Sequence, residues 1–172
     1  MDVTGSSAPR SDRPARPSAP AGSLAVHHLF DLGIEFARMD IVPTALGTRM
    51  VAVIRAGTFE GPALRGTVQS GGGDWIVVGS DGIARLDIRA TLRTDGDDLV
   101  YMTASGRIRL TAEARERFLA GDPVSDPEMV GRATPLFETG ASLPEPLNAL
   151  VTIAVVHELA LDHIDYRIYA LE

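Results

Sequence analysis

The chain has 172 residues, of which 45% are hydrophobic, and carries a net charge of −7. Its 16 basic residues are all arginine and it has no cysteine, which excludes thiol nucleophiles, disulfides, thiolate metal sites, Schiff-base lysines and a P-loop lysine. This length and composition predict one globular domain, and the acidic balance argues against a nucleic-acid surface.

The first 23 residues are dominated by Pro, Ala, Ser, Gly and Arg and show no apolar periodicity. We therefore expect a disordered tail over residues 1–23 and a folded domain over 24–172. A transit peptide is the rival interpretation because of Arg10, Arg13 and Arg16, but four prolines and two aspartates do not suit an amphipathic targeting helix. No apolar stretch is long enough to cross a bilayer and no signal-peptide segment is evident, so a cytoplasmic location is the expectation.

Short apolar runs separated by glycine-rich turns follow the tail. We expect strands at 29–36, 48–55, 64–68, 75–78, 83–93, 99–109, 132–138, 147–158 and 163–170, with a loop at 43–47. About nine strands at this spacing predict an all-β protein, specifically a single antiparallel β-barrel, rather than a βαβ fold. One short α-helix is expected after Thr111, which suits an N-cap, with Glu113 in its first turn and Gly121 after its end. This helix is expected to cover one end of the barrel.

The strongest local pattern is the alternation of polar and apolar residues over 85–93 and again over 99–109. Alternation of period two predicts strands with unlike faces, and the Asp-Gly within the intervening 94–98 predicts a hairpin turn. Asp81-Gly82 is interpreted as a second hairpin turn. The pattern alone leaves open which face is interior.

The chain resembles a bacterial and fungal family known as domain of unknown function 3237, also called UPF0311. The resemblance is carried by Gly57-Thr58-Phe59-Glu60-Gly61-Pro62, Leu64-Arg65-Gly66-Thr67-Val68, Gly72-Gly73-Asp74-Trp75, Asp81-Gly82, Asp87-Ile88-Arg89, Arg132-Ala133-Thr134-Pro135-Leu136-Phe137-Glu138-Thr139-Gly140 and Leu147-Asn148. It implies a compact lipocalin-like or calycin-like barrel and no established general activity. Pro146 stands where the family tends to have an aromatic residue, which puts the shape of the loop 141–146 in question.

Asp87 and Arg89 are two residues apart and lie on one strand face, so they could pair inside a barrel or bind a polar ligand there. If that face points to solvent, they are ordinary surface charges. Arg132 could bind a carboxylate, phenolate or enolate through its planar guanidinium, or form a structural salt bridge with Asp87 or Glu138.

Glu60 and Asp74 each stand next to an aromatic residue at a strand end. Desolvation by an aromatic neighbour can raise the pKa of a carboxyl group and fit it for general acid or base catalysis, whereas the alternative role is capping of turn amides. The catalytic candidates are thus Glu60, Asp74, Asp87, Arg89 and Arg132. The candidates for substrate binding are Trp75, Tyr101, Phe137 and Asn148, with core packing as the alternative for Trp75 and a strand-edge hydrogen bond as that for Asn148.

His27, His28, His157 and His163 lack the spacing of a chelating pair, although His157 and His163 flank the last hairpin. No metal and no cofactor are expected, because no nucleotide-binding glycine motif and no Gly-x-Ser-x-Gly turn occurs either.

Two functions from different classes remain. One is a cofactor-independent isomerase, cyclase or lyase of secondary metabolism, which holds a polyketide- or terpenoid-like substrate in the barrel and uses acid–base chemistry. The other is a lipocalin-like protein that binds a small hydrophobic molecule without turnover. A third reading is a structural subunit, in which the apolar outer face of 147–156 would suit a homodimer.

Overall fold

The structure is a computed structural model that describes residues 22–45 and 47–172. It contains β1 (Val26–Thr44), β2 (Gly47–Glu60), β3 (Arg65–Val68), β4 (Gly73–Val78), β5 (Ala84–Thr94), β6 (Leu99–Leu110), α1 (Ala112–Ala120), β7 (Val124–Ser125), β8 (Met129–Glu138), the 3-10 helix η1 (Leu147–Ala149), β9 (Thr152–Leu159) and β10 (His163–Leu171). The disordered tail predicted for residues 1–23 falls almost entirely on residues 1–21, which lie outside the described residues.

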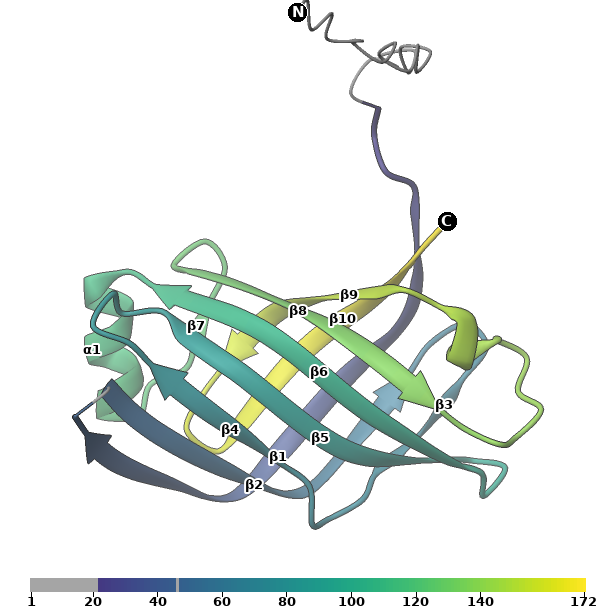
Figure 1. Ribbon diagram of the computed structural model, residues 1–172, viewed down its shortest axis with the longest axis horizontal. Helices are drawn as coiled ribbons and strands as arrows, with labels where there is room; N and C mark the ends of the chain where they lie inside the picture. The colour runs from purple at the N-terminus through teal and green to yellow at the C-terminus, as the bar shows by residue number, and fades with distance from the viewer. Residues whose placement is uncertain (1–21, 46) are drawn as a thin grey trace, which may run out of the picture.

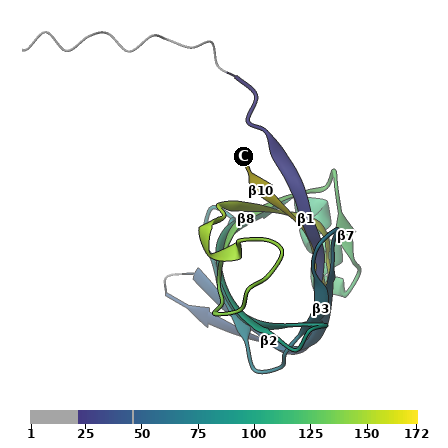
Figure 2. The same ribbon diagram turned by 90° about the vertical axis from the view of Figure 1, so that its right-hand side faces the viewer.

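The strands form one antiparallel sheet that closes on itself. Neighbours follow the order β1-β10-β9-β8-β6-β5-β3-β2-β4, and further pairings join β1 to β2 and β5 to β4. The ring of hydrogen bonds closes because β1 pairs on one edge with β10, starting at Val26 and Leu171, and on the other edge with β2. The end-on view shows the resulting barrel (Figure 2). The predicted all-β barrel fold is confirmed.

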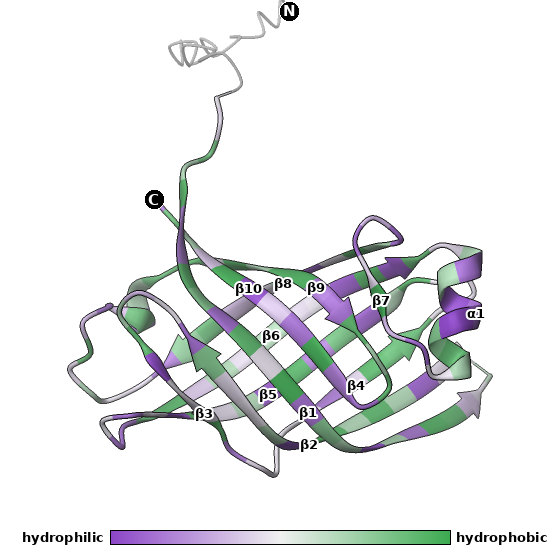
Figure 3. Cartoon of the chain, turned by 180° about the vertical axis from the view of Figure 1, so that it is seen from behind, coloured by the Kyte–Doolittle hydropathy of each residue, from purple (hydrophilic) through white to green (hydrophobic). Residues whose placement is uncertain are grey.

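Alternation of residue types decides which side chains fill the barrel. Along β5 the even-numbered residues Leu86, Ile88, Ala90 and Leu92 are buried, and β6, β8 and β10 repeat this alternation. The strands accordingly change between hydrophobic and hydrophilic residues along their length (Figure 3). Within the core Phe30 packs against the rings of Phe59 and Phe137, with centroids 5.2 and 5.7 Å apart.

Several strand boundaries differ from the expectation. β1 is longer than the expected 29–36 and pairs with β2 as far as Thr44 and Gly47, so Pro43, Thr44 and Gly47, expected in a loop, belong to strands. The strand expected over 147–158 begins only at Thr152, because Pro146 opens η1 and the first three residues form a 3-10 turn. The two-residue strand β7, which pairs with β9, had no signal in the sequence. Of the apolar stretch 147–156, Leu147 and Val156 belong to the core and Val151 is exposed, so the dimer face remains a prediction.

The two ends of the barrel are covered by different elements. Helix α1 lies across one end, and the loop between β8 and β9, which includes η1, lies across the opposite end (Figures 1 and 2). The predicted caps of α1 are confirmed: the Thr111 hydroxyl accepts a hydrogen bond from the Ala114 amide, and Gly121 has a φ of 99°. None of the helices within 22–45 and 47–172 has the length and apolar character needed to cross a membrane.

Candidate functional site

A cavity of about 230 Å³ lies at the end of the barrel that α1 covers. Its lining is almost entirely aliphatic and aromatic, and the strands β1, β2, β4, β5, β6, β9 and β10 contribute to it together with α1. The side chains that carry charge in this lining are Asp74 and Arg115. A concave apolar pocket with few polar groups is the usual form of a small-molecule site.

Asp74 enters the cavity because of its place in β4. The strand alternates so that Asp74 and Ile76 face the interior, and Asp74 is only 6% exposed. The pairing of β4 with β5 runs through Asp74 and Ile88 and resumes at Val77 and Arg85. Between these pairs the backbone N–H of Asp87 donates a hydrogen bond of 2.9 Å to Asp74 Oδ1. The carboxyl group is therefore anchored through one oxygen.

The surroundings of Asp74 change its acidity. Burial raises the pKa of Asp74 from 3.8 to about 7, because the charged form loses its hydration in the apolar cavity. The hydrogen bond from the Asp87 amide opposes this shift, and the nearby Asp87 carboxylate adds to it. No hydrogen bond among the described residues engages Asp74 Oδ2, so this oxygen is available to a ligand. A carboxyl group with a pKa near 7 can both donate and accept a proton at neutral pH.

Two further residues, Tyr166 and Arg115, are not among the candidates that the sequence offers. Tyr166 on β10 is buried, and burial together with the negative charge of Asp74 raises the pKa of its phenol well above the usual value. Arg115 belongs to α1 and lines the cavity. The alternation of β10 could have placed Tyr166 inside, because Ile164, Tyr166 and Ile168 share one face. No sequence pattern marks Arg115, whose position depends on how the helix packs.

Three of the catalytic candidates, Asp87, Arg89 and Arg132, do not lie inside the barrel. All three are exposed on the outer face, because the apolar residues that alternate with them fill the interior. Asp87 and Arg89 form an ion pair of 3.0 Å on that surface, as the alternative interpretation had it. Arg132 donates a hydrogen bond of 2.7 Å to the carbonyl oxygen of Gly131, and within the described chain it forms no ion pair with Asp87 or Glu138.

Trp75 and Glu60 also lie outside the cavity. Trp75 is 41% exposed, and the guanidinium of Arg89 lies 5.6 Å from the centre of its ring. Neither core packing nor a cavity wall is its role. Glu60 is exposed at the end of β2 and lines a depression on the outer wall. Because Trp75 faces outward, it does not account for the raised pKa of Asp74, and the catalytic role of Asp74 stays a prediction.

The candidates for substrate binding do not reach the cavity either. Tyr101, Phe137 and Asn148 meet at a shallow depression near the opposite end, where Tyr101 is 41% exposed and the Phe137 side chain belongs to the core. Asn148 Oδ1 accepts a hydrogen bond from the Thr139 amide, and its Nδ2 donates one to the Thr139 carbonyl oxygen. Asn148 thus fixes the loop that begins after β8, which is the structural alternative.

One group of side chains on the outer wall has the geometry of metal ligands. Ligand atoms of Glu158, His163 and Asp165 lie within 4.8 Å of one another. His163 faces Glu158 rather than His157, and its two ring nitrogens lie 2.9 Å from Glu158 and Asp162 carboxylate oxygens. Hydrogen bonds to Glu158 and Asp162 raise the pKa of His163, which favours its charged form and ion pairs with these two carboxylates.

Comparison with known proteins identifies relatives for most of the chain. A relative called UPF0311 protein, from Rhodopseudomonas palustris strain TIE-1, is 28% identical over 95 residues, which are 55% of this chain and 61% of that protein. The chain thus matches less than two thirds of the length of this relative.

Solved structures with the same fold include three proteins from different organisms. A conserved protein of unknown function from Rhodopseudomonas palustris gives a TM-score of 0.82 at 19% identity, over 88% of this chain and 99% of that one. A β-barrel-like protein from Acinetobacter baumannii AYE gives 0.75 at 28% identity, over 91% and 100%. A structure described as an enzyme from Penicillium herquei gives 0.66 at 18% identity, over 90% and 98%. Since the family model for the protein of unknown function DUF3237 matches residues 24–171, this chain belongs to the DUF3237 family.

Proposed function

We propose that this protein is a cofactor-independent enzyme that carries out acid–base chemistry on a small hydrophobic molecule in the cavity beneath α1. The reaction class is an isomerisation, cyclisation or lyase reaction, and the substrate is an apolar, polyketide- or terpenoid-like compound of natural product metabolism. Asp74 is the group that transfers the proton.

One observation carries this proposal: the acid of the cavity lining has a pKa of about 7 and an oxygen free of hydrogen bonds. A merely structural carboxyl group is usually paired with a cation or saturated with hydrogen bonds, whereas a raised pKa in a cavity is typical of catalytic groups. The family is of unknown function, and one protein with a similar fold is described as an enzyme, which is compatible with catalysis on this scaffold.

The second candidate is a lipocalin-like binding protein that holds a hydrophobic molecule without converting it. The observation in its favour is the largely apolar lining of the cavity, which would retain such a molecule by burial alone. The two functions differ in what they require of Asp74, since binding by burial needs no proton transfer.

The experiment that separates them is proton exchange in heavy water. A panel of small hydrophobic ketones and phenols is incubated with the protein, and deuterium uptake at carbon is followed by mass spectrometry. The enzyme is expected to accelerate uptake into at least one compound, and Asp74→Asn is expected to lower the rate by about 100-fold or more. Because the ionised carboxylate is the base, the wild-type rate should rise with pH up to about 7 and then level off.

Glu60→Gln and Glu138→Gln serve as matched controls, because each removes one exposed carboxylate from outside the cavity. Both variants should retain exchange activity within a few-fold. Equal exchange by wild type and Asp74→Asn would contradict the catalytic role. Binding of a compound without any exchange by the wild-type protein would favour the carrier.

A further inference from the structure

The charged groups of the cavity differ in kind and in position. Asp74 is buried in the barrel wall, whereas Arg115 belongs to the helix that covers the end and is exposed. Between them the lining consists almost wholly of apolar side chains such as Met50, Ile76 and Phe118. A ligand that fills this cavity therefore meets an acid at the wall and a cation at the covering helix.

The position of Arg115 is set by α1 and by the turn that follows β4. In the helix its neighbour Ala114 is buried, and Phe118 packs into the core. Arg115 Nη1 lies against Gly82, where an added Cβ would come within 3.3 Å of it. The guanidinium group thus lies over the β4–β5 turn at the edge of the cavity.

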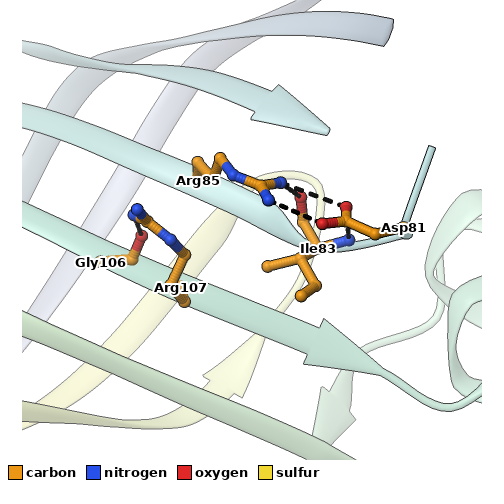
Figure 4. Close-up of polar contacts among 5 residues, drawn as sticks. All are labelled: Asp81, Ile83, Arg85, Gly106 and Arg107. Carbon is orange, nitrogen blue, oxygen red and sulfur yellow. Dashed lines mark hydrogen bonds and ion pairs between the residues drawn. The ribbon is translucent and has the colours of Figure 1, made fainter. Parts of the chain in front are cut away.

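The β4–β5 turn is itself fixed by other contacts. The Asp81 carboxylate accepts hydrogen bonds from the Ile83 amide at 3.0 Å and from Arg85 at 2.6 and 3.1 Å (Figure 4). The hydrogen bonds from Arg85 lower the pKa of Asp81 to about 2, so this carboxylate stays ionised and bound to Arg85. Asp81 is therefore not the partner of Arg115, although Asp81 lies in the turn over which the Arg115 guanidinium is placed.

Arg115 has no carboxylate within 4.0 Å among the residues that the structure describes, whereas Arg117 on the same helix forms an ion pair with Glu128. Arg117 donates hydrogen bonds of 2.7 and 2.8 Å to the two carboxylate oxygens of Glu128. A guanidinium group has planar donors whose geometry matches a carboxylate. The unpaired Arg115 at the edge of an apolar cavity is thus suited to such a group on a ligand.

We propose that Arg115 binds a carboxylate of the ligand, so that the substrate is a small hydrophobic carboxylic acid. Its apolar body fills the cavity and its carboxylate lies at α1, while the carbon that exchanges a proton is the part next to Asp74. This inference rests on the proposed function, because it assigns the ligand class of the same cavity. It makes Arg115 a residue that determines specificity.

The test uses calorimetric titration with two probes of nearly equal shape, 2-naphthoate and 2-naphthamide. At pH 6 a carboxylic acid of ordinary pKa is ionised while Asp74 is mostly protonated, so the probes differ in the charge offered to Arg115. We expect the wild-type protein to bind 2-naphthoate about 10-fold more tightly than 2-naphthamide, and the preference to weaken with added salt.

Arg115→Met should remove this preference and leave the affinity for 2-naphthamide within about twofold, which also shows that the cavity is intact. Arg132→Met is the matched control, because it removes an exposed arginine from the outer wall. This variant should keep the preference.

A preference that survives in Arg115→Met, or equal affinity of the wild-type protein for the two probes, overturns the role of Arg115 but leaves the cavity as a binding site. If the wild-type protein binds neither probe, the inference fails together with the ligand site on which the proposed function depends. Asp74→Asn should lose proton exchange and still bind both probes with unchanged affinity. That result would support the catalytic role of Asp74 whatever the outcome for Arg115, so the two proposals can fail separately.

Discussion

A carboxyl group enclosed by hydrocarbon connects the stability of this protein to pH. The pKa of Asp74 is about 7 in the folded chain and near 4 when the chain is unfolded, so the folded state holds the proton more tightly. The stabilisation is present below about pH 4 and is lost as pH rises through about 7. Asp74 therefore keeps its position at a cost to stability under neutral and alkaline conditions, as is common for groups at functional sites.

Asp74→Asn should abolish this pH dependence, because the amide is neutral at every pH and can still accept the hydrogen bond from Asp87. At pH 8 the free energy of unfolding of the variant should exceed that of the wild type by up to about 4 kcal/mol, and at pH 4 the two should be similar. Urea unfolding at a series of pH values measures this difference. Glu60→Gln, which changes an exposed acid, should follow the wild type, and parallel curves for Asp74→Asn and wild type would contradict the buried, protonated state.

At this scale the sequence offers Asp74 as a candidate but does not predict its surroundings. The sequence makes Asp74 a candidate because it stands beside Trp75, yet adjacent residues of a strand point to opposite faces, so Trp75 cannot desolvate it. The same rule does not say whether Asp87 and Arg89 face the interior or the solvent, since alternation defines two faces without saying which one is interior. That choice depends on the barrel closing around the apolar face, which is a property of all the strands together.

Among the elements, α1 covers the end of the barrel where the cavity lies (Figure 1), and it provides Arg115, Phe118 and Leu119 to the lining. The helix has only nine residues, and a helix of this length is marginal without caps and tertiary contacts. The Thr111 hydroxyl, the left-handed Gly121 and the Arg117–Glu128 ion pair together fix it over the barrel end.

Thr111→Ala should therefore reduce both stability and ligand binding. Loss of an N-cap hydrogen bond costs about 1 kcal/mol of unfolding free energy, and a less ordered α1 should weaken the binding of 2-naphthamide several-fold. Chemical denaturation and calorimetric titration measure the two effects. Thr111→Ser keeps the hydroxyl and should behave as the wild type; a Thr111→Ala protein that binds with full affinity would show that the helix is not needed to enclose the ligand.

Elements with a strong local pattern were predictable, and elements defined by long-range packing were not. The strands β5 and β6 and the turn between them follow from strict alternation and an Asp-Gly turn, although Asp97 rather than Gly96 has the positive φ. η1 begins at Leu147, directly after Pro146, which has no backbone N–H to donate to a neighbouring strand. β7 forms by pairing with β9, far along the chain.

For the molecule as a whole, the contact between the first and last strands closes the ring. β10 pairs with β1 on one side and with β9 on the other, so its inward residues are enclosed from both directions. Ile168 is 1% exposed within this strand. The barrel should therefore unfold as one cooperative unit, so that a destabilising substitution in β10 lowers the unfolding free energy of the whole barrel.

Ile168→Ala should lower the free energy of unfolding by about 2–5 kcal/mol, because it leaves a cavity in the closed core. Leu136→Ala on β8 is the control, since Leu136 is 54% exposed and its truncation should cost no more than about 0.5 kcal/mol. Denaturation monitored by circular dichroism compares the two. Similar losses in both variants would mean that closure at β10 contributes little.

The location of Trp75 has a practical consequence for anyone studying this protein. Its indole, the single one in the chain, stands under Arg89 on the outside of the wall, while the inner face of the same strand lines the cavity. Because the indole lies outside the cavity, tryptophan emission should change little when a ligand binds. An unchanged fluorescence signal during a titration would therefore be no sign that the cavity is empty.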